Sequence, residues 1–75
     1  MNTDITIDGT TYRLAAFRSR QGWLGEWLEE GSGRSGVVST PSGSAEEALD
    51  RAREEALAVH HRDAALAPVR TAVVP

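Results

Sequence analysis

One amphipathic stretch, Ser44 to His61, constrains the fold of this chain more than any other feature of its sequence. Ser44 and Glu47 have the spacing of a capping box, in which each side chain accepts a hydrogen bond from a backbone N–H at the start of a helix. Apolar residues then recur at helical spacing, namely Ala45, Ala48, Leu49, Ala52, Ala56 and Val59. The pattern predicts one helix whose narrow, alanine-rich stripe packs closely on a flat surface.

The residues before this helix alternate in the manner of short strands. Ile5 and Ile7 are separated by polar residues and are followed by Asp8-Gly9. This dipeptide is a strong signal for a two-residue hairpin, because both positions tolerate positive φ. Further strands are expected at residues 10–18 and 23–30, joined by a polar turn at 19–22, and a short edge strand is expected at Val37-Val38 before Pro41 ends it.

The second and third expected strands carry apolar groups on both sides. Side chains alternate along a strand, so Tyr12, Leu14 and Ala16 oppose Ala15 and Phe17 in one strand, and Trp23, Gly25 and Trp27 oppose Leu24, Glu26 and Leu28 in the next. One helix covers one face of such a sheet, whereas a solvated second face normally reads as polar. The sequence therefore predicts that a second copy, a partner protein or the segment 66–75 covers the other face.

These signals predict an α+β domain of the order β-β-β-α. A small antiparallel three-stranded sheet, to which the short strand at Val37-Val38 can add a fourth, packs on one C-terminal helix. Residues 1–65 are expected to form the single domain. Residues 66–75 are expected to be a tail that is either flexible or an added strand, with Val69, Val73 and Val74 as its packing groups.

Composition restricts the classes of function. A chain of 75 residues without cysteine buries a modest core and has neither disulfides nor a thiolate zinc site, so we expect it to associate with a protein partner or as a homodimer. A net charge of −3 argues against direct nucleic-acid binding. Because the sequence has no long apolar run and no signal-peptide pattern at its start, we expect a cytoplasmic protein that does not bind membranes.

No residue pattern indicates catalysis, a cofactor or a metal. The chain has no cysteine nucleophile, no serine or threonine motif with a base, and no carboxylate pair whose spacing suggests acid–base chemistry. His60 and His61 are adjacent, and adjacent side chains on a helix point about 100° apart, which does not suit chelation of one ion. We expect a protein that is not an enzyme.

Two groups of residues are candidates for binding a partner. Trp23 and Trp27 share one side of a strand and belong either to the core or to an interface, where tryptophan is a frequent anchor. The other group is acidic and consists of Glu47, Asp50 and Glu54 on the helix, extended by Glu26, Glu29 and Glu30. These carboxylates either form a solvated helix face, supported by the i,i+4 pair of Glu47 and Arg51, or dock on a basic surface of another protein.

The order of motifs resembles the N-terminal domain of HicB-like antitoxins. The chain has G-W-L-G-E-W, a glycine-rich turn, T-P-S-G-S and then S-A-E-E-A-L-D-R-A-R-E-E-A, so that the resemblance covers about residues 12–61. It implies a protein that oligomerises through its sheet and helix and neutralises a small RNase toxin by masking its active site. Two departures are the absence of the family's C-terminal DNA-binding segment and the replacement of its P-x-x-P-G turn by residues 29–33.

We therefore expect a non-enzymatic binding or inhibitory protein that acts by protein–protein contact and is antitoxin-like. The alternative is a phage or mobile-element inhibitor of a host nucleic-acid-targeting defence complex, similar in size and acidity to anti-CRISPR proteins. In that alternative the helix carboxylates, Glu47 and Asp50 among them, contact Arg or Lys of a basic channel.

Overall fold

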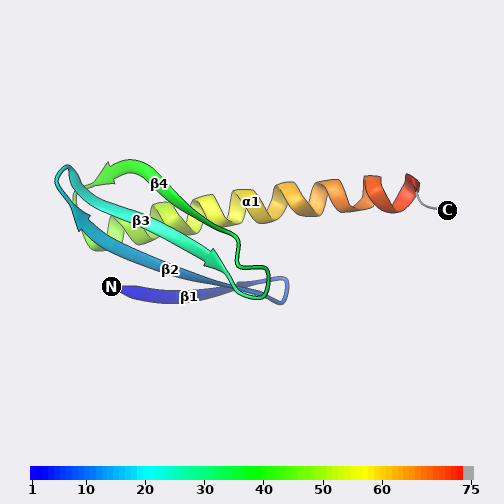
Figure 1. The fold of residues 1–75 in the computed structure, drawn as a ribbon, viewed down its shortest axis with the longest axis horizontal. Coiled ribbons are helices and arrows are strands. Elements are labelled where there is room, and N and C mark those ends of the chain that lie inside the picture. The colour runs from blue at the N-terminus through cyan, green and yellow to red at the C-terminus, as the bar shows by residue number, and fades with distance from the viewer. Residues whose placement is uncertain (74–75) are drawn as a thin grey trace.

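Four antiparallel strands and one helix make up the fold (Figure 1). The computed structural model describes the backbone of residues 1–73 and the side chains of residues 1–63. The elements are β1 (Asn2–Ile7), β2 (Thr10–Ser19), β3 (Gly22–Glu29), β4 (Ser35–Ser42) and α1 (Ala45–Val73). The sheet has the order β1-β2-β3-β4, and α1 lies along one face of it. This confirms the α+β class, with the fourth strand present.

The turn between β1 and β2 has the predicted conformation. Asp8 and Gly9 have φ values of 51° and 81°, and Ile7 pairs with Thr10 across the turn. Two consecutive positive φ values suit the right-handed twist of the strands that they join. The register of β1 against β2 is regular from this turn back to Asn2.

Strand β4 continues past the point where Pro41 was expected to end it. Gly25 pairs with Val38 and Trp23 pairs with Ser42, so the one residue of β3 between these pairs lies opposite three residues of β4. The extra residues form an irregular segment that includes Pro41. Proline, which lacks a backbone N–H, is tolerated in such a segment and on an edge strand. The predicted boundary was therefore wrong, because an irregular pairing accommodates the proline.

The core lies between α1 and the two central strands. Tyr12, Leu14 and Trp27 are buried on the sheet side, and Ala52 and Ala56 are fully buried on the helix side. The helix packs most extensively on β3 and β2 and least on β1. The predicted alanine stripe is thus the surface by which α1 approaches the sheet.

The start of α1 is capped as predicted. The Ser44 Oγ accepts a hydrogen bond from the Glu47 N–H at 3.1 Å, and the Glu47 carboxylate accepts one from the Gly43 N–H at 3.5 Å. These bonds satisfy donors that have no partner within the helix.

The end of α1 lies well beyond His61, the expected last residue. The helix continues to Val73 and runs past the end of the sheet (Figure 1). The run 62–67 contains no glycine or proline and is rich in alanine, which favours helix. The structure thus continues the helix into the segment expected to be a tail or an added strand, whereas Val74, Pro75 and the packing of Val69 and Val73 lie outside the described residues. Among those described, no helix combines the length and apolar character needed to cross a bilayer.

Candidate protein-binding surfaces

The face of the sheet opposite α1 carries exposed apolar side chains. Phe17 and Leu28 are each 40% exposed and Val37 is 52% exposed, whereas Leu24, which pairs with Phe17, is half-buried. We call these four residues the open face. Exposed groups of this kind that cluster on one side of a small domain are typical of a contact surface. The expectation that both sides of the sheet are apolar while the helix covers only one is met in the described part of the chain.

Charged residues lie beside the open face. Glu26 is exposed and pairs with Val37 across the strands, and Arg13 pairs with Leu28. The Arg13 Nε donates a hydrogen bond of 2.6 Å to the Glu30 carboxylate. A partner that covers the open face would therefore meet an apolar centre with one carboxylate and one guanidinium beside it, an arrangement that favours a specific orientation.

Trp27 does not belong to an exposed surface. It is 6% exposed, its ring packs edge-to-face on Tyr12 with 6.1 Å between centroids, and its Nε1 donates a hydrogen bond of 2.7 Å to the Glu55 carboxylate. Of its two predicted roles, core and interface anchor, the structure places it in the core. Trp23 is half-buried, and the Arg18 guanidinium lies 5.9 Å from its ring centroid.

The acidic candidates on the helix are partly neutralised by arginine. The Glu47 carboxylate lies 3.7 Å from the Arg51 guanidinium, and the Asp50 carboxylate lies 3.6 Å from the Arg53 guanidinium. These distances are expected for neighbours on one helix face. Glu54 is exposed. Pairs of this kind contribute little stability at an exposed surface, so these groups remain accessible to a partner.

The acidic candidates on the sheet do not extend that patch. Glu26 points to the side of the sheet away from α1, whereas its neighbours Gly25 and Trp27 are buried beneath the helix. Glu29 and Glu30 lie at the end of β3, where they pair with Arg34 and Arg13 respectively. The six carboxylates are therefore distributed over several surfaces rather than gathered on one.

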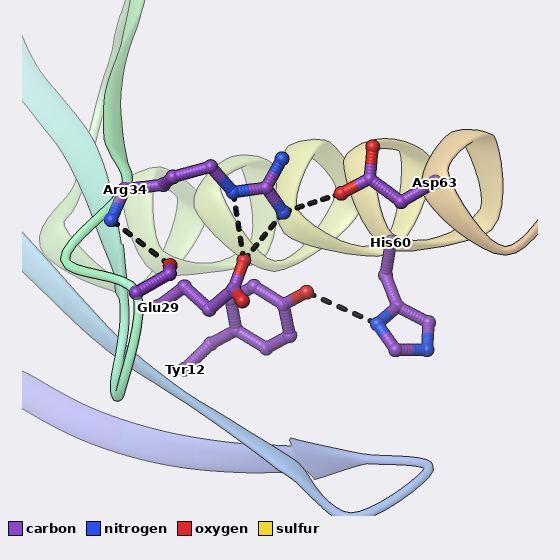
Figure 2. Close-up of polar contacts among 6 residues, drawn as sticks. Tyr12, Glu29, Arg34, His60 and Asp63 are labelled. Atoms are coloured by element: carbon purple, nitrogen blue, oxygen red, sulfur yellow. Dashed lines mark hydrogen bonds and ion pairs between the residues drawn. The ribbon is translucent and has the colours of Figure 1, made fainter. Parts of the chain in front are cut away.

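The structure also contains polar contacts between the helix and the sheet that the sequence did not predict (Figure 2). The Arg34 guanidinium lies between the carboxylates of Glu29 and Asp63, and its Nε donates to Glu29 at 3.0 Å. The hydrogen bond to Asp63 and then that to Glu29 raise the pKa of Arg34 above its usual range. This bridge connects the turn between β3 and β4 with the far half of α1.

A second connection joins Tyr12, His60 and Asp8. The Tyr12 hydroxyl lies 3.0 Å from the His60 Nδ1, and the His60 Nε2 lies 3.0 Å from the Asp8 carboxylate (Figure 2 shows the first contact). A neutral imidazole satisfies both partners when its Nε2–H donates to the carboxylate and its Nδ1 accepts from the phenol. One sequence signal was available, because His60 follows Ala52 and Ala56 at the same four-residue spacing on the buried side of the helix.

Tyr12 provides a test of this packing at alkaline pH. Burial, and then the charge of Glu29, raise the pKa of the phenol from its ordinary value of 10.0. A raised folded-state pKa gives stability that is fully present below the unfolded value and is lost as the pH rises through the folded value. We therefore expect the free energy of unfolding to fall as the pH rises above 10.0, measured by urea denaturation at a series of pH values.

The matched control is Tyr12→Phe. All eight basic residues of the chain are arginines and Tyr12 is its only tyrosine, so no other side chain titrates near the same pH. We expect the variant to be less stable at neutral pH, because the bond to His60 is lost, but to show no further loss from pH 10.0 to the start of arginine titration. An equal alkaline loss in the variant would contradict the assignment to Tyr12.

The described residues include no group of three His, Cys, Asp or Glu side chains placed to hold a metal ion. Two surfaces, the open face and the carboxylates of α1, are held in place by polar contacts of the helix with Trp27 of β3, with Asp8 in the turn between β1 and β2, and with Arg34 in the turn between β3 and β4. Comparison with known proteins adds no relative: no family model, no curated protein and no solved structure matches this chain.

Proposed function

We propose that this protein is a non-enzymatic binding protein that acts by protein–protein contact through its open face. The observation that carries the proposal is the exposure of Phe17, Leu28 and Val37 on one side of a sheet whose other side is closed by α1. Burying such side chains is the main source of affinity in protein association. A chain of 75 residues gains stability as well as affinity from that burial.

The partner in this proposal is a small RNase toxin, which the protein inhibits by covering its active site in the manner of a HicB-like antitoxin. The choice of this partner rests on the order of motifs in residues 12–61, which resembles that of the N-terminal domain of HicB-like antitoxins. Glu26 and Arg13 beside the open face supply charges that orient such a partner.

A second candidate function is inhibition of a nucleic-acid-targeting defence complex through the acidic side of α1. It is favoured by the exposed carboxylates of Glu46 and Glu54, for which no ion pair is recorded among the described residues. A protein with net charge −3 can occupy a channel lined with Arg or Lys.

Co-expression with the products of the flanking reading frames tests both candidates. A complex is detected by size-exclusion chromatography with light scattering, and its affinity is measured by calorimetry. We expect Leu28→Glu to weaken the complex by roughly 100-fold, because a carboxylate replaces an apolar contact at the centre of the interface. We expect Glu54→Lys, on the opposite side of the molecule, to leave the affinity within about threefold.

The reverse result, loss with Glu54→Lys and no change with Leu28→Glu, would favour the second candidate function and contradict the first. Light scattering of the isolated protein is the accompanying control. A dimer that Leu28→Glu converts to a monomer would keep the open face as the contact surface and make a second copy its occupant. Far-ultraviolet circular dichroism confirms that both variants are folded, as expected for exposed positions.

A further inference from the structure

Strand β1 leaves one side of its backbone without a neighbouring strand among the described residues. The Met1 carbonyl accepts a hydrogen bond of 2.9 Å from the Ala16 N–H of β2. This bond identifies which alternate residues of β1 point their backbone groups toward β2. Successive residues of an antiparallel strand point their N–H and C=O groups to opposite sides. Asn2, Asp4 and Thr6 therefore direct theirs away from β2, toward open space at the edge of the sheet.

A groove runs beside this edge on the helix side of the sheet. Its volume is about 360 Å³, and its walls include Ile5 and Leu14 of the sheet and Leu49 of the helix. The charged groups Glu46, Asp50 and Arg53 border it on α1. The groove exists because α1 packs on β3 and β2 and least on β1. We call this space, together with the free edge of β1, the β1 groove.

The two edges of the sheet differ in how far they oppose the addition of a strand. Strand β4 carries Pro41 and an irregular pairing, which are features that protect an edge from further pairing. Strand β1 pairs regularly along its whole length and contains no proline. The edge beside the groove is therefore the one that can accept another strand.

A second copy of β1 is a poor occupant of this edge. The antiparallel register in which Asn2, Asp4 and Thr6 all find partners places Asp4 directly opposite Asp4 of the second copy. Like charges that face each other across a strand pair are destabilising. The same carboxylate attracts a basic residue on a foreign strand.

We propose that the β1 groove binds an extended segment of a partner protein, which adds to β1 as an antiparallel fifth strand whose residues opposite Asn2, Asp4 and Thr6 form the hydrogen-bonded pairs. Side chains of that segment opposite Thr3 and Ile5 point to the helix side and enter the groove, where Leu14 and Leu49 favour aliphatic groups. The side chain opposite Asp4 points to the other side of the sheet, where Lys or Arg pairs with the carboxylate. The segment recognised is one in which aliphatic and basic residues alternate.

This inference rests on the proposed function only in taking a protein as the ligand, since it uses a different surface from the open face. Main-chain hydrogen bonds to Asn2, Asp4 and Thr6 provide affinity for any extended chain. The side chains that line the groove, together with Asp4, select among the sequences of such chains. A substitution in the open face therefore leaves the β1 groove intact, and the reverse is also true, so that binding at each surface is tested separately.

The probe is the synthetic peptide acetyl-T-V-K-L-K-V-T-amide, titrated into the full chain labelled with nitrogen-15. We expect saturable shifts of the Asn2, Asp4 and Thr6 amide resonances and slower hydrogen exchange at these positions. The matched control peptide carries N-methyl groups on its two lysines, whose N–H groups face β1 in the proposed register. We expect it to bind at least about tenfold more weakly, because the donors of the ladder are removed.

A charge exchange tests the side-chain part of the proposal. Asp4 is exposed and pairs with Arg13 across the strands, so Asp4→Lys places two cations opposite each other and is expected to be slightly less stable but still folded, which circular dichroism checks. We expect this variant to bind the lysine peptide about tenfold more weakly and to bind the peptide with both lysines replaced by glutamate more tightly than the natural chain does. Recovery with the glutamate peptide separates loss of charge pairing from loss of folding.

Several results would overturn the proposal. One is the absence of saturable shifts of the β1 amide resonances, and another is equal affinity for the N-methylated and the unmodified peptide. A third is a set of shifts along β1 that depends on protein concentration alone, because it would identify a second copy of the chain as the occupant. Shifts confined to Phe17, Leu24 and Leu28 would contradict peptide binding in the β1 groove and would support binding at the open face. Peptide binding that persists in Leu28→Glu, when that variant has lost its protein partner, would show that the two surfaces act separately, as proposed.

Discussion

Gly25→Ala is expected to lower the free energy of unfolding by about 3 kcal/mol or more. A Cβ at this position would overlap the carbonyl oxygen of Ala48 and lie 3.1 Å from the Cβ of Ala52. Neither atom can rotate away, because one belongs to the helix backbone and the other is attached directly to it. The whole of α1 would have to lift from β3, which separates the alanine stripe from the sheet.

The size of this effect matters because the domain is small. At about 0.05–0.15 kcal/mol per residue, a chain of 75 residues has a total stability of roughly 4–11 kcal/mol. One methyl group at Gly25 therefore removes a large part of the stability. Urea denaturation followed by tryptophan fluorescence measures the change, since Trp27 lies beside the affected contact.

Gly43→Ala is the matched control. A Cβ at Gly43 would meet no atom within 4 Å, and the residue is not among those with positive φ. We expect its stability to stay within about 0.5 kcal/mol of the natural chain. Equal denaturation midpoints for the two variants would contradict the close approach of α1 to β3, and with it the reason why the helix stripe consists of alanine.

The parts of the fold that the sequence predicts correctly depend on residues close together in the chain. The cap at Ser44 involves Glu47, three positions later, and the first hairpin depends on Asp8 and Gly9 alone. The alternation along β2 likewise assigns Tyr12 and Leu14 to one side of the sheet. Each of these features follows from local steric or hydrogen-bonding rules, which is why periodicity and turn chemistry are sufficient to find them.

The polar contacts between the helix and the sheet depend on pairings between residues far apart in the chain. The hydrogen bond between Tyr12 and His60 spans 48 residues, and the bond between His60 and Asp8 spans 52. No spacing rule relates such positions until the register of the helix on the sheet is known. The same reason explains why the acidic residues could be counted from the sequence but not assigned to one surface, since Glu26 and Glu54 prove to lie on opposite sides of the molecule.

The β1 groove was beyond sequence analysis for a related reason. Alternation places Ile5 and Leu14 on the helix side of the sheet, and helical spacing places Leu49 toward the sheet. How far the helix axis is displaced toward β3, however, depends on where the helix can come closest. Gly25 allows that approach on β3, so α1 is drawn to the centre of the sheet and leaves the space beside β1 open.

Trp27→Ala is expected to lower the free energy of unfolding by about 3–5 kcal/mol, the usual cost of removing a buried aromatic ring. The indole fills the space between β3 and α1, and Gly36 of β4 leaves room for it, since a Cβ there would lie 2.6 Å from the Nε1. The substitution also leaves the Glu55 carboxylate without its donor at 2.7 Å. Against the total stability of such a chain, this loss unfolds a substantial fraction of the protein at 37 °C.

Two further substitutions separate packing from hydrogen bonding at this position. Trp27→Phe keeps most of the ring contact but removes the indole N–H, so we expect a loss of about 1–3 kcal/mol, smaller than that of the alanine variant. Trp23→Ala, at a half-buried position, is expected to cost less than Trp27→Ala when both are measured by urea denaturation monitored by circular dichroism. If Trp27→Ala instead had the same stability as the natural chain, the Trp27 ring would have to lie at the surface. That result would favour the other predicted role of Trp27, an anchor in an interface with a partner. With the ring in the core, failure of Trp27→Ala to bind a partner reports unfolding, which is why tests of binding belong at Leu28 and Asp4.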